Sequence, residues 1–174
     1  ADVISGGEVN DMGAGDQEWE ASIGLTFAGL YALIARKHMH DFGTTQEQLA
    51  MVSVNNHKNG LKNKYAQFQM AITVDDVLTS SMIADPLRLY DCSPITDGAA
   101  AVVLASEDFA KKLDVQPIYV LGSGHATDTV ALHDRKSFTE MLATKIAAKA
   151  AFKQADMGPE NINVTEVHDC FTIN

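Results

Sequence analysis

The chain has 174 residues, of which 46% are hydrophobic and 21% are charged, values typical of one ordinary globular domain. Its 13 Lys and Arg against 23 Asp and Glu give a net charge of −10. That balance argues against a broad surface for nucleic acid or for an anionic membrane, because no general field attracts polyanions. Two cysteines are too few for a disulfide framework and favour a reducing compartment, the cytoplasm. No apolar run in the sequence reaches the ~18 residues of a membrane span.

Helical periodicity and capping signals predict two consecutive helices in the first third of the chain. Apolar residues recur at roughly helical spacing over 22–41, and Gly43 follows at the position where a helix commonly ends in a left-handed residue. Thr44, with Glu47 three residues later, has the pattern of a capping box and predicts a second helix to about His57.

Short apolar, β-branched runs predict the strands of a sheet. These runs are residues 1–7, 99–105, 118–124 and 163–169. Capping residues predict three further helices, which begin after Thr73, after Ser106 and after the Ser137–Glu140 capping box. Strands that alternate with helices predict α/β layering, with a loop over 8–20 and an irregular, charged middle over 58–95 of the kind found in inserted subdomains.

The polar tip that follows the last predicted strand, His168-Asp169-Cys170, is the sharpest candidate for chemistry. In open α/β sheets, ligands bind in the loops after the carboxyl ends of strands. Adjacent residues of an extended chain point to opposite faces, so His168 and Cys170 share a side while Asp169 points away. An imidazole beside a thiol can accept its proton and make it a nucleophile or a proton shuttle. The alternative is that Cys170 is a small buried hydrophobe and His168 a loop residue bound to backbone.

A second cluster, residues 55–68, combines amides, His57 and three lysines, among them Lys58, with almost no acid. In a chain of net charge −10, this local positive patch is the natural place for a phosphate-bearing ligand. The alternative is a solvated helix C-terminus whose cations complement the helix dipole.

Residues 92–101 follow Cys92 with a run of small residues that allows close backbone approach, either to a ligand or between packed elements. Taken alone, this run favours packing. No metal site is predicted, since His38 and His40, two residues apart on a helix, cannot face one another.

Three segments together resemble the thiolase superfamily, in particular the sterol carrier protein x-type thiolases and their archaeal and bacterial relatives. These segments are NNHKNGLKNKYAQFQ (55–69), CSPITDGAAAVVLAS (92–106) and EVHDCF (166–171). They occur in family order with family-like spacing, and Gly7-Glu8 with Met12 is similar to a degraded strand-end motif of the family.

The resemblance implies a thiolase-like fold of layered αβα type, present only in part. Residues 1–57 and 96–125 are then expected to belong to the N-terminal half, 58–95 to the inserted loop domain, and 126–174 to the start of the C-terminal half. The chain begins without an initiator Met or signal peptide, so we expect an internal piece that is inactive alone, with the nucleophilic Cys upstream and a Gly-His-Pro motif downstream. Cys92 is then a structural residue.

The resemblance further implies an acyl-CoA acetyltransferase that condenses two acetyl-CoA molecules or thiolyses a 3-oxoacyl-CoA. His168 matches the family position that helps form the oxyanion site for the thioester carbonyl, and Cys170 matches the acid/base thiol of this subfamily. His57 and Lys58 are the candidates for contact with CoA. No metal or redox cofactor is implied, since coenzyme A thioesters are the substrates.

Two alternatives remain open within this resemblance. One is a thiolase-like aldolase that cleaves a side-chain β-hydroxyacyl-CoA; such lyases usually lack the acid/base Cys, so Cys170 favours the transferase. The other is a non-catalytic thiolase-fold subunit that binds acyl-CoA. A role in lipid metabolism and a homodimer or homotetramer are expected, and some archaeal relatives work beside a small OB-fold partner that handles acyl-CoA.

Overall fold

The computed structural model describes residues 15–174, so the predicted strand over 1–7 and the first part of the predicted loop lie outside the described residues. The chain divides into two compact units. Unit 1 joins the stretch that ends at Ile95 with Asp128–Met141 and Glu166–Asn174, and unit 2 joins Thr96–Thr127 with Leu142–Thr165. Among the described residues, no helix is long and apolar enough to cross a membrane.

The first long helix of unit 1, α1 (Phe27–Phe42), begins later than the periodicity predicts. A short 3-10 helix, η2 (Ala21–Ile23), precedes it and ends at Gly24, which has φ +86°. The chain is then extended at Thr26, whose Oγ1 accepts a hydrogen bond from the Gly29 N–H (3.1 Å) and starts the helix. The predicted end is confirmed, because Gly43 adopts φ +71° and its N–H bonds back to Met39.

The second helix, α2 (Gln46–Gly60), is opened by a capping box one residue further on than predicted. Thr45 Oγ1 accepts from the Gln48 N–H (3.3 Å), and Gln48 Oε1 accepts from the Thr45 N–H (3.0 Å). The predicted pair Thr44–Glu47 is wrong because the Thr44 hydroxyl is instead hydrogen-bonded to His38 Nδ1 (2.7 Å). The predicted cap at Thr73 is correct and opens α3 (Val74–Thr79).

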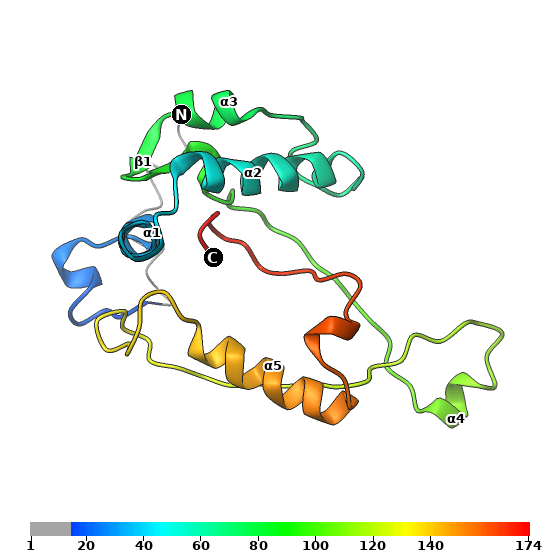
Figure 1. The fold of residues 1–174 in the computed structure, drawn as a ribbon. Helices are drawn as coiled ribbons and strands as arrows, with labels where there is room; N and C mark the ends of the chain where they lie inside the picture. The colour runs from blue at the N-terminus through cyan, green and yellow to red at the C-terminus, as the bar shows by residue number, and fades with distance from the viewer. Residues whose placement is uncertain (1–14) are drawn as a thin grey trace. The chain divides into compact units, whose positions relative to one another are not determined.

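A small antiparallel hairpin, β1 (Met82–Ala84) with β2 (Leu87–Arg88), follows α3 and leads into the 3-10 helix η3 (Leu89–Asp91). Figure 1 shows α2 and α3 side by side in unit 1, with the hairpin near one end of α2. Leu87 and Ala35, both fully buried, pack with Leu49 and Ala32 into a core that joins α1, α2 and β2. This core packs together the helices that carry the candidate site, and Phe171 and Ile173 of the C-terminal segment pack against it.

Unit 2 contains α4 (Glu107–Ala110), α5 (Leu142–Ala155) and η4 (Pro159–Asn161). The predicted helix after Ser106 is confirmed, but the Ser137–Glu140 capping box is wrong, since α5 begins only at Leu142. Ser137 Oγ bonds the N–H of Thr139, two residues on, which is not the contact of a helix cap. Gly122 and Gly124 lie against the α5 backbone, where a Cβ would collide with the carbonyl oxygens of Ala151 and Ala147.

The predicted strands over 99–105, 118–124 and 163–169 are not formed among the described residues, where β1 and β2 are the two named strands. All three runs lack a ladder among the described residues, because strand structure requires a neighbour's N–H and C=O groups. Their apolar side chains are accordingly exposed, with Val103 at 96% and Ile118 at 95%. The three predicted strands are therefore wrong for the described residues.

Candidate functional site

A groove of about 350 Å³ runs along the C-terminal turns of α2 in unit 1. Three further segments complete its walls: the loop at 66–68, the stretch from η3 to Pro94, and the C-terminal segment (166–174). Its lining includes Ser53, Asn56, His57, Phe68, Tyr90, Ser93, Asp169 and Thr172. One wall therefore comes from the cationic cluster and another from the polar tip that the sequence singled out.

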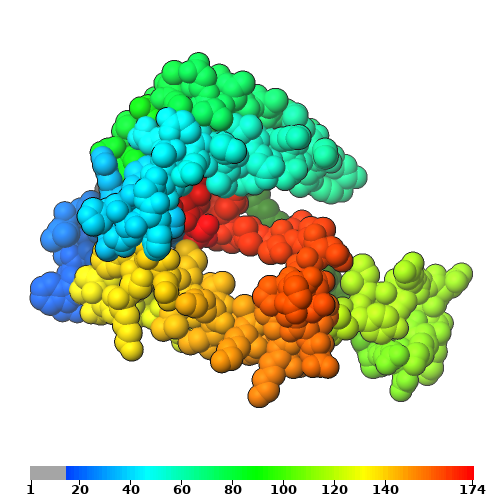
Figure 2. Space-filling view, in the orientation of Figure 1, coloured from blue at the N-terminus to red at the C-terminus, as the bar shows by residue number. Residues whose placement is uncertain are grey.

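The C-terminal segment is fixed against η3 by a short antiparallel bridge between Cys92 and Phe171. The Ser93 N–H donates to the Cys170 carbonyl (2.9 Å), and the Thr172 N–H donates to the Asp91 carbonyl (3.0 Å). Thr172 also donates from Oγ1 to the buried Asp91 carboxylate (2.8 Å). Figure 2 shows the last residues of the chain packed against the atoms of α1 and α2. These contacts fix the C-terminal segment against η3 and the residues that follow it.

Neighbouring residues of the tip turn to different partners. Asp169 accepts a hydrogen bond from Asn56 of α2 and lines the groove, while the Cys170 side chain contacts Tyr31 of α1. This divergence of adjacent residues is the alternation expected of an extended segment. His168 is exposed, and its carbonyl accepts from the Asn174 amide.

Tyr31 is the polar group that meets Cys170. Its ring is stacked on Phe171, with 4.4 Å between ring centroids and 25° between the planes. Burial, followed by the hydrogen bond with Cys170, raises the pKa of Tyr31 to about 12. The hydroxyl therefore stays protonated at neutral pH.

His57 and Lys58, the two predicted CoA contacts, differ in position. His57 lines the groove, with its Nδ1 3.1 Å from the Met70 carbonyl and its ring edge-on to Tyr90 at 5.8 Å between centroids. Lys58 is exposed and is not one of the groove residues. The structure thus brings His57 and Asp169 to one groove and leaves Lys58 outside its lining.

Cys92 has the environment of an inert thiol. Burial, and secondly the charge of Asp91, raises the pKa of Cys92 to about 12. Its Sγ donates to the Arg88 carbonyl (3.3 Å). A thiol held in the protonated form is a poor nucleophile, which agrees with a structural role.

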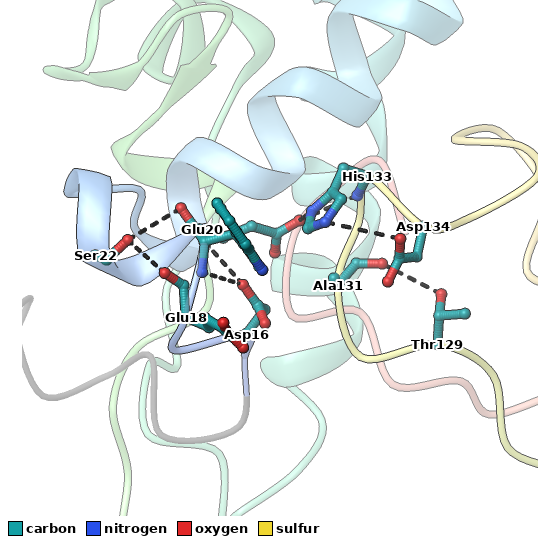
Figure 3. A network of polar contacts seen from close by, with 9 residues as sticks. Asp16, Glu18, Glu20, Ser22, Thr129, Ala131, His133 and Asp134 are labelled. Atoms are coloured by element: carbon teal, nitrogen blue, oxygen red, sulfur yellow. Dashed lines mark hydrogen bonds and ion pairs between the residues drawn. The ribbon is translucent and has the colours of Figure 1, made fainter.

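A second polar cluster, shown in Figure 3, joins the stretch before α1 to residues 128–134 of unit 1. The carboxylate of Asp16 accepts from the N–H groups of Trp19 (2.7 Å) and Glu20 (2.9 Å). The buried Glu20 carboxylate accepts from the His133 N–H (3.1 Å) and pairs with His133 Nδ1 (3.0 Å). That pairing, ahead of the charge of Asp134, raises the pKa of His133. This cluster connects segments and adds no group to the groove.

Sequence reasoning gave no role to Tyr31, Asn56 or Thr172. Tyr31 occupies an ordinary apolar position of a helix, and Asn56 and Thr172 lie in polar stretches that were singled out for other residues. Within residues 15–174, no group of three or more His, Cys, Asp and Glu side chains is arranged to hold a metal ion. The site is thus built of thiol, imidazole, amide, carboxylate and phenol groups.

Comparison with protein families gives two matches along the chain. Residues 8–108 match the model described as "Thiolase, N-terminal domain", and residues 124–174 match "Thiolase C-terminal domain-like".

Comparison with individual proteins gives relatives named as acetyl-CoA acetyltransferases and as sterol carrier protein 2. The chain is 56% identical over 161 residues to an acetyl-CoA acetyltransferase of Methanothermobacter thermautotrophicus, covering 92% of this chain and 42% of the relative. It is 38% identical over 150 residues to sterol carrier protein 2 of Gallus gallus, covering 83% and 27%. A solved structure named "Ltp2-ChsH2(DUF35) aldolase" matches with a TM-score of 0.83 and 29% identity, covering 89% of this chain and 42% of that one. The chain thus spans less than half the length of these proteins.

Proposed function

This chain belongs to the thiolase family, and we propose that it supplies part of the active site of an acyl-CoA acetyltransferase. The thiolase-like fold expected from the sequence is confirmed by the two domain matches and by the structural likeness. The reaction proposed is the reversible Claisen condensation of two acetyl-CoA molecules, or the thiolysis of a 3-oxoacyl-CoA. The relative at 56% identity bears the name of that activity.

One observation carries the proposal: Asn56 of the cationic cluster donates a hydrogen bond to Asp169 of the tip His168-Asp169-Cys170, and Asp169 and His57 line one groove. An acyl-CoA enzyme must bring the phosphate-bearing cofactor and the proton-transfer group together at one thioester carbon. The groove provides a wall from each of these two sequence clusters.

The roles of the tip follow from the chemistry of the thioester. Attack on a thioester carbonyl develops charge on its oxygen, and His168 contributes to the site that stabilises that charge. Cys170 removes a proton from the α-carbon of the second acyl-CoA, or gives one to the leaving CoA sulfur. The covalent nucleophile is a further Cys of the complete enzyme, since Cys92 is held as a neutral thiol.

The groove is the proposed site of the CoA pantetheine arm. Its lining combines amide and hydroxyl groups with Phe68 and Tyr90, which suits an amide-bearing thin chain. His57 lies at the wall, and the exposed ammonium of Lys58 is placed to meet the more distant phosphates. No metal or redox cofactor enters the proposed reaction, whose chemistry is acid/base and nucleophilic.

The likeness to the solved aldolase structure supports a second candidate function, retro-aldol cleavage of a β-hydroxyacyl-CoA. Cys170 favours the transferase, because condensation and thiolysis need a second thiol for proton transfer. The aldolase is named for two components, Ltp2 and ChsH2(DUF35). Assembly with a small OB-fold partner that handles acyl-CoA, which the family resemblance implies, belongs to the same proposal. A homodimer or homotetramer, a cytoplasmic location and a place in lipid metabolism complete it, and light scattering that gave a monomer would contradict the oligomer.

The test is an assay of the complete protein that carries this chain. We expect CoA-dependent thiolysis of acetoacetyl-CoA and, in the reverse direction, its formation from acetyl-CoA. Cleavage of a β-hydroxyacyl-CoA without thiolysis would favour the aldolase, and binding of CoA without either reaction would favour a non-catalytic subunit. Sequencing about 30 residues upstream of Ala1, about one βα unit, would show whether the nucleophilic Cys is encoded.

A further inference from the structure

The imidazole of His57 makes a hydrogen bond that determines which of its two nitrogens is free for a ligand. Its Nδ1 lies 3.1 Å from the Met70 carbonyl oxygen, and a carbonyl oxygen can only accept. Nδ1 therefore carries the proton in this contact, and in the neutral ring Nε2 is then an acceptor. Within residues 15–174, Nε2 has no hydrogen-bond partner. Because His57 lines the groove, Nε2 is the nitrogen available to a ligand there.

Packing holds the imidazole of His57 in this orientation. The ring of Tyr90, on η3, lies at 89° to the imidazole, with 5.8 Å between ring centroids. Tyr90 is itself fixed, since its carbonyl accepts from Oγ of the buried Ser53 (2.5 Å). It also packs against a buried cluster that includes Ile72. A ring held at one nitrogen and against a fixed neighbour keeps its other nitrogen in one place, as a specific binding site requires.

A second group of the groove has the same polarity as Nε2. Asp169 accepts a hydrogen bond from the side-chain amide of Asn56, and an ionised carboxylate offers only acceptor oxygens. Asp169 and His57 line the same groove. A phosphate group at neutral pH also offers acceptors and negative charge, so it is repelled by Asp169 and gains no hydrogen bond from Nε2. A secondary amide, by contrast, offers an N–H donor to such a wall.

We propose that His57 is a specificity-determining residue of the groove: its Nε2 accepts a hydrogen bond from an amide N–H of the pantetheine arm of coenzyme A. This inference rests on the proposal above that the groove binds that arm. It differs from the interpretation that the sequence suggested, in which the imidazole adds to a positive patch for phosphate. The phosphates are then met by cations outside the groove lining, such as the exposed Lys58.

The first test is the tautomer of His57, measured by NMR on the complete protein with ¹⁵N-labelled histidine. At about pH 8, where an ordinary imidazole is neutral, we expect Nδ1 protonated and Nε2 unprotonated, and the His57→Gln spectrum identifies the signals by their loss. Added pantetheine, which has no phosphate, should shift the Nε2 signal, since this nitrogen gains a hydrogen bond. Adenosine 3′,5′-bisphosphate, a phosphate-bearing part of coenzyme A, should leave it in place. An Nε2–H tautomer, no shift with pantetheine, or a shift with the bisphosphate would each overturn the inference.

A change of polarity at the same position gives the second test. His57→Lys replaces the acceptor by an ammonium donor, so the Kd for CoA, measured by calorimetry, should rise about tenfold or more, the cost of one unmet hydrogen bond. His57→Gln, whose side-chain oxygen can accept, should raise the Kd less. His40→Lys is the matched control and should leave the Kd unchanged, because the His40 side chain is 83% exposed on α1. If His57 met a phosphate, His57→Lys would bind CoA as tightly as wild type or more tightly.

These measurements separate the role of His57 from the reaction proposed for the complete protein. If neither thiolysis nor condensation is found, the proposed reaction fails, while the tautomer and the shift with pantetheine still decide the role of His57. If thiolysis is found and His57→Lys binds CoA as wild type does, the inference alone fails.

Discussion

The two cysteine-bearing segments of unit 1 face each other across one bridge, yet they place their thiols in opposite chemical settings. Cys92 is next to the buried Asp91 carboxylate, and its pKa is raised to about 12. Cys170 meets the Tyr31 hydroxyl and shares its segment with the groove residue Asp169. The difference teaches that burial beside an anion keeps the Cys92 thiol protonated, while Cys170, on the other side of the same bridge, directly follows a residue that lines the groove.

The largest effect that tests this contrast is expected from Cys170→Ser in the complete enzyme. A serine hydroxyl keeps nearly the same size but ionises far above neutral pH, so kcat should fall by roughly 10²–10⁴. The acyl-enzyme should still form on the nucleophilic Cys and be detected as an added acyl mass. If condensation and thiolysis stayed within about threefold of wild type, Cys170 would be a packed thiol and the contrast would disappear.

His168→Ala should have the next largest effect, of a different kind. Each half-reaction passes through a charged thioester oxygen, so we expect both to slow by about 10²–10³, the usual loss for one donor of an oxyanion site. Single-turnover measurement of acylation and of the second half-reaction distinguishes the two variants. A defect confined to the second step would remove His168 from the oxyanion site.

The two thiols should also differ in reactivity toward iodoacetamide. At about pH 8, a thiol with a pKa of about 12 is almost wholly protonated, so Cys92 should react at least about tenfold more slowly than Cys170. Peptide mass spectrometry of the native protein measures both rates in one sample, and urea-unfolded protein provides the control in which the rates converge. Faster labelling of Cys92 in the native protein would reverse the assignment.

Thr172→Val tests the contact that joins the two segments. The change removes the Oγ1 donor from the buried Asp91 carboxylate (2.8 Å) and keeps the size of the side chain. Leaving a buried acceptor short of one partner should lower the free energy of unfolding by about 1–3 kcal/mol. Thr172→Ser, which keeps the hydroxyl, is the control in urea unfolding. Equal stability of Thr172→Val and Thr172→Ser would show that the hydroxyl does not hold the segment.

The smallest effect is expected at His133, remote from both thiols, and it depends on pH. Glu20, with Asp134 and Asp16, raises the folded-state pKa of His133 above its ordinary 6.5. Protonated His133 therefore adds stability below about pH 6.5, and this contribution is lost as the pH rises through the folded-state value. The difference in urea midpoint between wild type and His133→Gln should shrink from about pH 5.5 to about pH 8.5. A difference that grew with pH would contradict the pairing with Glu20.

Most local structure of unit 1 was predictable because its signals are carried by neighbouring residues. Gly43 ends α1 and Thr73 caps α3, each through contacts a few residues apart. The capping box of α2 was predicted one residue early, since Thr44 and Thr45 carry the same local signal and only the contact of Thr44 with His38 separates them.

The strands show where local signals are insufficient. Val103 and Ile118 belong to β-branched runs that predict strands, yet these runs remain unpaired and exposed among the described residues. Strand propensity describes a side chain that suits a pleated surface, and the surface itself requires neighbouring chain.

The sequence by itself determined the thiolase resemblance, the ends of several helices and the candidates His57, His168 and Cys170. It could do so because a motif or a helix cap consists of residues that are close together in the sequence. Only the tertiary structure decided that Tyr31 meets Cys170, that Asn56 meets Asp169, and that Lys58 stands outside the groove lining. Those relations depend on how α1, α2 and the C-terminal segment pack. Packing is a property of distant side chains filling one shared volume, and no local pattern records it.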